Sequence, residues 1–354
     1  MCRLLASGVY DNISTLFGHV GIERGGKMKC TLLLLDNSPV TSVTGPMEIF
    51  SLANSLVPKN QRMQLQLVSP SGNDVDCLGG LSLSVHGQPD YEKADDPGNE
   101  QTTDLVIVGA IGHPDHRPAE YDSNILDWIR KQYYQGSRVA SICTGSFVLA
   151  ATGLLDGMAA TTHWQCASLF RQRFPQVKLK EQAMITEQEW LFCSAGASAY
   201  QDMSIYLVRV LWGEVIADQC AKALLIDLDR HGQSQYASFQ PYRQHNDELI
   251  LGLQGWLDDH YKQDLTMVEL AERVHLSERQ FKRRFKQATQ VSPLAYVQSL
   301  RMELAKKLLA TTNKPISEIS HLSGYEDLRF FRQLFKRFTA LSPSEYRQKF
   351  ALRA

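Results

Sequence analysis

One stretch decides the fold of the C-terminal part of the chain: LTMVELAERVHLSERQFKRRFKQA, Leu265–Ala288. Thr266 and Glu269 have the spacing of a capping box, so a first helix is expected to begin directly after Thr266. A second helix is expected after Ser277, because serine accepts hydrogen bonds from the free N–H groups at a helix start. Two short helices joined by a tight turn form a helix-turn-helix unit.

The second helix of this unit is predicted to be amphipathic. Phe281 and Phe285 lie four residues apart, which places both rings on one face of the helix. The basic residues Arg279, Lys282 and Arg283 point largely away from that face. A helix that packs on a protein core and also lies in the major groove of DNA needs these two opposite faces.

The same pattern returns about fifty residues later. Pro315 is expected at the start of a helix, Gly324 in a turn, and Asp327 as the cap of a second amphipathic helix. Between the two units, Pro293–Ala310 is predicted to form one helix of roughly 27 Å, at about 1.5 Å per residue. Successive major grooves on one face of DNA lie about 34 Å apart. A rigid spacer of this scale sets two recognition helices in neighbouring grooves.

These residues carry a family resemblance. The segment SGYEDLRFFRQLFKRFTALSPSEYR, Ser323–Arg347, resembles the signature of the AraC/XylS family, and the first unit resembles that family's other half. One departure is that Gln290 and Ala340 stand where the family usually has glycine. The resemblance implies binding to double-stranded DNA, with Arg332 near the backbone and Lys336 on phosphate. Matched by position, the base-facing residues are Arg279, Lys282, Arg283, Leu328, Arg329 and Gln333, and the DNA-binding residues also include Arg332 and Lys336.

Charge is distributed unevenly along the 354 residues. Leu265–Ala354 contains 17 Lys+Arg and 8 Asp+Glu, a charge of +9, whereas the remainder carries −10. A basic end on an acidic body indicates an anionic partner for that end, although a solvated helical surface has the same composition. No apolar run is long enough to cross a membrane, so no membrane partner is expected.

Seven cysteines occur without a CxxC pair or zinc spacing. We therefore expect a cytoplasmic protein without metal or cofactor. The histidine-containing run from Gly112 to His116 is interpreted as a loop rather than a metal site, because no carboxylate cluster or HExxH pattern accompanies it.

Short apolar runs alternate with helical stretches from Met28 to about Gly213. Strands that are apolar on both sides and alternate with helices predict a parallel sheet covered on both faces. The expected fold is thus an α/β flavodoxin-like domain with a parallel sheet, followed by an all-α domain of two helix-turn-helix units. The expected divisions are an N-terminal extension over 1–27, either a mobile tail or a start codon called too early, a sensor domain over 28–228, a linker over 229–245, and a DNA-binding domain over 246–354.

The most informative part of this first domain is RVASICTGSFVLAATGLLDGMAATTHW, Arg138–Trp164. A strand is expected to end at Cys143 and a helix to start at once. Such an elbow lifts a side chain above the sheet at a helix N-terminus. The helix dipole and free N–H groups there favour a thiolate, and they also suit an oxyanion or a ligand carboxylate.

The elbow resembles that of the PfpI-type proteins, which are related to class I glutamine amidotransferases. The similarity extends over about 170 residues and includes GPMEIF, Gly45–Phe50, and the Ser-Ala-Gly run that begins at Ser194. It implies that Cys143 is the family's elbow cysteine, Glu48 its acidic partner and His163 a histidine found in some members. The candidate effector-binding residues are therefore Glu48, Cys143, Thr144 and His163.

A PfpI-like domain followed by an AraC-type domain resembles the GlxA family of transcription regulators. The resemblance implies a homodimer whose front domain senses a small metabolite, for which a nitrogen-containing compound is the expectation, and no enzyme activity. Two alternatives remain open. One is a cysteine-dependent hydrolase or hydratase with Cys143, Glu48 and His163 as catalytic residues, fused to a DNA-binding domain. The other is redox sensing through Cys143.

Overall fold

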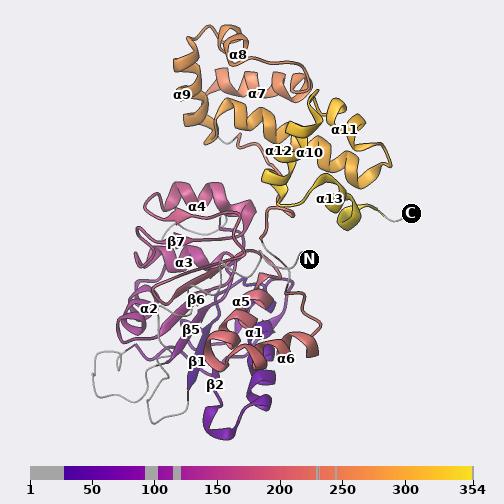
Figure 1. Ribbon diagram of the computed structural model, residues 1–354. Coiled ribbons are helices and arrows are strands. Elements are labelled where there is room, and N and C mark those ends of the chain that lie inside the picture. The colour runs from indigo at the N-terminus through magenta and orange to yellow at the C-terminus, as the bar shows by residue number, and fades with distance from the viewer. Residues whose placement is uncertain are drawn as a thin grey trace.

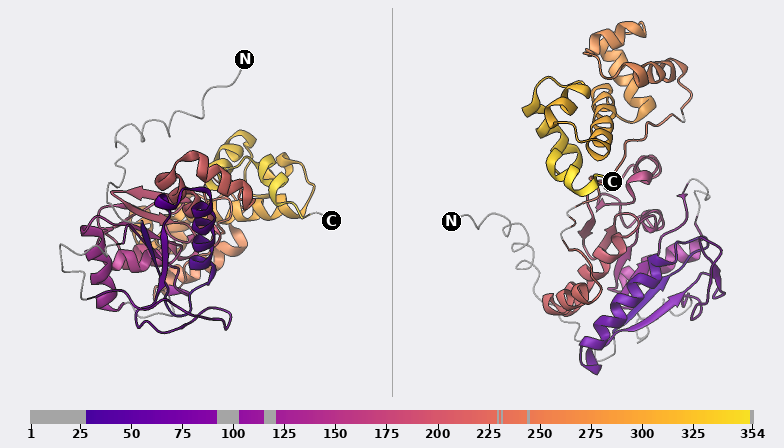
Figure 2. Two further views of the ribbon diagram at one scale, coloured as in Figure 1. Left: turned by 90° about the horizontal axis from the view of Figure 1, so that it is seen from below. Right: turned by 90° about the vertical axis from the view of Figure 1, so that its right-hand side faces the viewer.

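The computed structural model describes residues 28–91, 103–114, 121–228, 230, 232–243 and 245–352. Within this part of the chain, an α/β region is followed by an all-helical region (Figure 1). The expected N-terminal extension, 1–27, lies outside the described residues. The right-hand view of Figure 2 shows the helical region joined to the α/β region through the segment that follows helix α6.

The α/β region is built on a six-stranded sheet with the strand order β2-β1-β5-β6-β10-β9. The first five strands in this order run parallel, which confirms the predicted parallel sheet. The last strand, β9, is an antiparallel edge strand. Their bounds are β1 (Lys29–Leu33), β2 (Gln64–Val68), β5 (Leu105–Val108), β6 (Arg138–Ser141), β9 (Ile185–Gln188) and β10 (Leu191–Ser194).

Helices cover both faces of the sheet because the strands are apolar on both sides. Leu32 and Ile107 pack on one face, whereas Leu33 and Val106 pack on the other. The first face is covered by α1 (Thr41–Leu56), α5 (Ala199–Trp212) and α6 (Glu214–Ala223). The second is covered by α2 (Ser123–Tyr134), α3 (Gly145–Ala151) and α4 (Ala167–Arg173).

Among the described residues of this region, the smaller elements are two short two-stranded pairings and two turns of 3-10 helix. The pairings join β3 (Val75–Asp76) to β4 (Ser82–Leu83) and β7 (Ala159–Ala160) to β8 (Lys178–Leu179). The 3-10 turns are η1 (Lys59–Gln61) and η4 (Trp164–Cys166).

The helical region contains the two predicted helix-turn-helix units, each on its own apolar core. The capping box of Thr266 with Glu269 and the caps at Ser277 and Asp327 all form as predicted. The bounds are α7 (Glu248–His260), α8 (Met267–Arg273), α9 (Glu278–Thr289), α10 (Pro293–Thr311), α11 (Ile316–Leu322), α12 (Leu328–Thr339) and α13 (Pro343–Phe350). Helices α8 and α9 form the first unit, α11 and α12 form the second, and α10 connects them.

The second helix of each unit ends in a left-handed residue. Gln290 has φ 65° after α9, and Ala340 has φ 61° after α12. These helices therefore end in the left-handed conformation that glycine most readily adopts, at a cost of roughly 1 kcal/mol for each non-glycine residue. The departure from the family pattern costs stability but leaves the winding of the helix end unchanged.

Arg301 of α10 fixes the two units to each other. Its Nε and Nη2 each donate a 2.6 Å hydrogen bond to a carbonyl oxygen at the end of α7, those of Tyr261 and Gln263. Its Nη1 donates to the carbonyl oxygen of Gly324, in the turn of the second unit, over 3.0 Å. One planar guanidinium thus joins the end of α7, a helix that shares one apolar core with the first unit, to the turn of the second unit through three fixed donors.

Candidate DNA interface and effector site

Helix α9 presents a basic face to solvent. Arg279, Lys282 and Arg283 are exposed, while Phe281 and Phe285 are fully buried on the opposite side. Lys282 forms an ion pair with Glu278 one turn earlier, so part of its charge is already compensated. Among the described residues, no ion pair compensates the charge of the two arginines.

Helix α12 presents the equivalent face in the second unit. Arg329, Arg332, Gln333 and Lys336 are all exposed. Leu328, the other candidate on this helix, is half-buried and packs against the second core. Its side chain is therefore less available to DNA than the four polar ones.

Phe330 is a feature of α12 that sequence reasoning missed. Its ring is 46% exposed at the start of the helix. The signal was present in the sequence, because Phe330 does not share the face of the buried pair Phe331 and Phe335.

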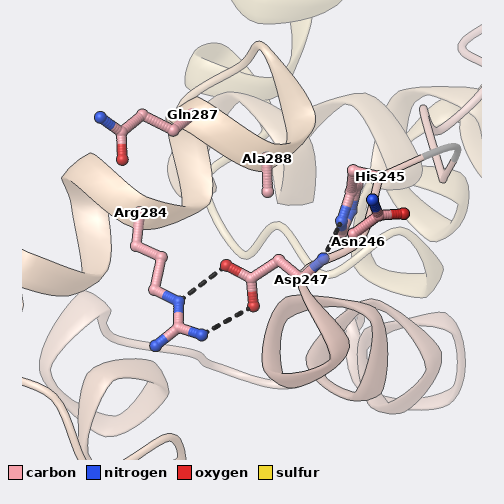
Figure 3. A pocket seen from close by; sticks show the side chains of 6 residues that line it. All are labelled: His245, Asn246, Asp247, Arg284, Gln287 and Ala288. Atoms are coloured by element: carbon pink, nitrogen blue, oxygen red, sulfur yellow. Dashed lines mark hydrogen bonds and ion pairs between the residues drawn. The ribbon is translucent and has the colours of Figure 1, made fainter.

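Not every basic residue of α9 belongs to the exposed face. Arg284 turns toward the start of α7, where its Nε and Nη2 donate to the carboxylate of Asp247 over 2.7 and 3.0 Å (Figure 3). This hydrogen bonding lowers the pKa of the Asp247 carboxyl group. The pair lies in a shallow pocket lined by His245, Asn246, Asp247, Arg284, Gln287 and Ala288. Arg284 therefore fixes α9 against α7, and its charge is compensated within the protein.

In the α/β region, Cys143 occupies the predicted elbow between β6 and α3. Its φ of 55° is a strained value for a residue with a side chain, and it is 9% exposed. The backbone N–H groups of Ala197 and Thr144 hydrogen-bond the sulfur and favour the thiolate, but burial outweighs them and raises the pKa of the Cys143 thiol. The helix start was expected to favour the thiolate, and desolvation reverses that expectation.

We expect Cys143 to react slowly with iodoacetamide at pH 7, because its raised pKa leaves little thiolate at that pH. The alkylation rate, followed by mass spectrometry of the Cys143 peptide, should still be rising above pH 9. The pKa of a free cysteine thiol is about 8.5. A rate that levels off at or below that pH would contradict the raised pKa of Cys143. Glutathione alkylated in the same tube calibrates the reagent at each pH.

His163 lies beside the elbow, on the loop that leads into η4. A Cβ atom built on Gly196 would lie 1.8 Å from the His163 Cδ2 atom, so the imidazole packs directly on the backbone next to Ala197. Its Nδ1 accepts a 3.1 Å hydrogen bond from the N–H of Gln165. Burial, and then the nearby charge of His113, lowers the pKa of His163. The ring is therefore predominantly neutral at pH 7.

Thr144 and Glu48, the other two candidates, are placed differently. The Thr144 hydroxyl donates to the carbonyl oxygen of Ile111 over 2.5 Å and accepts from its N–H over 3.0 Å, so it fastens the elbow to the loop after β5. Glu48 is exposed on α1, on the side away from that helix's buried residues. Among the described residues, the hydrogen-bond partners of the Cys143 sulfur are on Ala197 and Thr144 and not on Glu48. The structure thus places His163 against the loop whose Ala197 N–H reaches the Cys143 sulfur, and it exposes Glu48 on α1.

The buried polar residue of α1 is Ser42, which sequence reasoning missed. It is 4% exposed, and its hydroxyl donates to the carbonyl oxygen of Pro39 over 2.8 Å. A Cβ atom on Gly109 would lie 3.3 Å from the Ser42 Oγ, and one on Gly145 would lie 2.5 Å from the Gly109 carbonyl oxygen. Ser42 therefore approaches the elbow from α1 through contacts that glycine allows.

Across the described residues, no group of three or more histidine, cysteine or acidic side chains is arranged to hold a metal ion. Of the expected loop over Gly112–His116, the last two residues lie outside the described part. Among the described helices, none is both long and apolar enough to span a bilayer.

Comparison with known proteins finds a matching family for each of the two regions. The profile described as the DJ-1/PfpI family matches residues 29–209, and the profile described as a helix-turn-helix domain matches residues 270–349. The HTH-type transcriptional regulator CdhR of Pseudomonas aeruginosa is 30% identical over 328 residues, which cover 91% of this chain and 92% of that protein. GbdR of the same species is also an HTH-type transcriptional regulator. It is 26% identical over 318 residues, which cover 89% of this chain and 83% of that protein.

A third relative is the HTH-type transcriptional regulator GlxA of Rhizobium meliloti. It is 23% identical over 317 residues, which cover 90% of this chain and 94% of that protein. All three similarities run through both regions of the chain, and all three relatives are named as regulators rather than enzymes.

Proposed function

This chain belongs to the DJ-1/PfpI family and is a DNA-binding transcription regulator, and on that premise we propose that α9 and α12 enter neighbouring major grooves of one duplex. The GlxA-type combination expected from the sequence is confirmed. One observation carries the proposal: equivalent helices of two units expose equivalent polar faces, while the equivalent aromatic pairs, Phe281 with Phe285 and Phe331 with Phe335, are buried. The spacer α10 has 19 residues, and Arg301 fixes the units on either side of it.

The side chains on these faces divide by chemistry. Arg279, Arg283 and Arg329 suit guanine, because a guanidinium donates two parallel hydrogen bonds to its major-groove edge, and Gln333 suits adenine. Arg332, Lys336 and the paired Lys282 suit phosphate oxygens, which fix the position of the protein without reading sequence. Leu328 is left for an apolar contact such as a thymine methyl group.

We propose further that a small metabolite binds at the elbow, between Cys143 and His163. Two backbone N–H groups converge on the Cys143 sulfur, and a neutral imidazole lies next to them. Such a site offers donors to a carboxylate or amide oxygen of a nitrogen-containing metabolite. The ligand shifts the protein between states only to the extent that it binds one of them better. A homodimer through the α/β region completes the proposal.

Two observations weigh against the alternative of a cysteine-dependent hydrolase or hydratase. The pKa of Cys143 is raised rather than lowered, and Glu48 lies on the exposed side of its helix. A nucleophilic cysteine needs a nearby base or a lowered pKa. The raised pKa also weighs against redox sensing, because oxidation follows thiolate character and exposure.

The function is tested by incubating the purified full-length protein with fragmented genomic DNA and sequencing the bound fragments. We expect an enriched motif with two parts separated by about one helical turn, 10–10.5 base pairs. The enriched duplex then serves as the probe in all later measurements. Recovery of fragments in proportion to their abundance in the input would overturn the proposed sequence-specific function.

A further inference from the structure

The segment between the two regions is held on both sides rather than free in solvent. We call residues 232–239 the strap. Its residues Gln233, Ser234 and Gln235 are buried, although all three are polar. Buried polar side chains need hydrogen-bond partners. Gln233 finds them on the α/β region and residues 237–239 are bound to α10, whereas the buried Gln235 Oε1 has no partner among the described residues.

At the first end, Gln233 is bound to the loop that presents His163. Its Nε2 donates to the carbonyl oxygens of Thr162 and Glu181 over 2.8 and 2.7 Å. Its Oε1 accepts from the N–H of Trp164 over 3.1 Å. The side chain thus holds the backbone on both sides of His163, and it is 3% exposed.

Arg230, just before the strap, is bound to the other loop beside Cys143. Its Nη1 and Nη2 donate to the hydroxyl and carbonyl oxygens of Ser198 over 2.8 and 3.0 Å, and its guanidinium pairs with Asp202 on α5. Ser198 follows Ala197, whose N–H reaches the Cys143 sulfur. The chain leading into the strap therefore contacts both loops that flank the elbow.

At the second end, the strap is bound to α10. The Nζ of Lys306 donates to the carbonyl oxygen of Ala237 and to the carboxylate of Glu303, each over 2.7 Å. Glu303 also accepts from the N–H of Phe239 over 3.0 Å and from the hydroxyl of Ser238 over 3.2 Å. Lys306 is 8% exposed, so the cation is satisfied by these contacts within the protein.

From the end of the strap, packed rings continue into the first recognition helix. Phe239 meets Tyr296 of α10 edge-on with 5.3 Å between ring centroids, and Tyr296 meets Phe285 of α9 in the same way at 5.3 Å. Phe285 lies on the buried side of the helix that exposes Arg279 and Arg283. A continuous series of hydrogen bonds and ring contacts therefore joins the elbow loops to α9.

We propose that the strap couples the elbow to the recognition helices, with Gln233 and Lys306 as its positioning residues. The inference rests on the proposed function, because it assigns the path by which that elbow site acts on DNA binding. A ligand that shifts either elbow loop changes the contacts of Gln233 or Arg230, and α10 is bound to the same segment. Coupling between two sites is reciprocal, so DNA bound to α9 and α12 must change the affinity of the elbow for its ligand by the same factor as the ligand changes the affinity for DNA.

This reciprocity allows a test that needs no knowledge of the metabolite. Hydrogen–deuterium exchange is measured on the full-length protein with and without the enriched duplex, in peptides that cover 159–168 and 194–200. We expect duplex binding to slow exchange in both peptides at least threefold in the unmodified protein, because DNA fixes the helical region and through the strap the loops. Gln233→Ala and Lys306→Met should each abolish the slowing while still binding the duplex.

Gln235→Ala is the matched control, because Gln235 is also a buried glutamine of the strap but its amide donates only to Gly232 within the strap. It should retain the slowing. Slowing that persists in Gln233→Ala or Lys306→Met, or that is absent from the unmodified protein while the duplex is bound, would overturn the coupling. Failure to recover any enriched duplex would instead overturn the proposed function. Peptides of the sheet core, around Cys30, report whether a variant is folded.

Discussion

Replacing Arg279 or Arg329 with alanine should weaken binding to the enriched duplex by about 1–3 kcal/mol, roughly 5- to 150-fold in Kd. Each side chain is exposed on the outward face of its helix, so its removal leaves the core unchanged. The loss should be largest when the base pair opposite that arginine is the preferred one, and small on duplexes already changed there. Fluorescence anisotropy on single-base variants of the duplex measures both effects at a fixed salt concentration.

Arg337→Ala is the matched control for this experiment. Arg337 is an exposed arginine on the same helix as Arg329, but its guanidinium lies near the Gln298 side chain and the Phe338 ring. We expect its replacement to change Kd less than threefold and to leave base preference unaltered. Equal losses of affinity for Arg337→Ala and Arg329→Ala on every duplex would show that the loss comes from removing a positive charge and not from losing a contact to a base.

Replacing Arg301 with alanine should reduce both the stability of the helical region and its affinity for DNA. The change removes three charge-assisted hydrogen bonds to carbonyl oxygens, two of them partly buried and one exposed, so we expect a loss of about 3 kcal/mol in the free energy of unfolding. Affinity should fall at least tenfold although Arg301 does not lie on either recognition helix, because the two units lose their fixed relative position. Urea unfolding and anisotropy measure the two effects.

Arg301→Lys separates geometry from charge. Lysine keeps the positive charge but lacks the planar fork that reaches three carbonyl groups at once. The lysine variant should therefore recover only a small part of either loss. Full recovery by lysine would mean that net charge, and not the joining of the two units, explains the role of Arg301.

Much of the helical region could be predicted because its signals are local. Capping at Thr266, Ser277 and Asp327 depends on residues within one turn, and the structure forms all three caps. The buried pairs that begin at Phe281 and Phe331 follow from helical spacing alone. The elbow at Cys143 was predicted for the same reason, since a buried strand, a turn and a helix follow one another directly.

The features that escaped prediction depend on contacts distant in sequence or on unusual backbone. Strand β9 pairs through a two-residue turn in which Glu189 and Trp190 have φ values of 51° and 68°, where Asn-Gly would be the usual signal. Helix α1 begins at Thr41 and contains Pro46, a residue type that usually marks the first turn of a helix. Burial of Cys143, which raises the pKa of its thiol, depends on residues far along the chain. The hydrogen-bond partners of the strap are also distant in sequence.

The exposure of the Glu48 carboxylate also could not be predicted from the sequence. A family pattern assigns a residue type to a position, but the direction of a side chain depends on which face of α1 the sheet and α5 cover. That face contains Ser42, Gly45 and Ile49, so the carboxylate of Glu48 faces solvent.

If α9 and α12 occupy neighbouring major grooves on one face of DNA, each helix protects its own set of bases. Methylation interference at guanine N7, which lies in the major groove, tests this placement most directly on the enriched duplex. We predict two clusters of interfering guanines about one helical turn apart, one lost in Arg279→Ala and the other in Arg329→Ala. A single cluster affected by both variants, or two clusters on opposite faces of the duplex, would contradict the account.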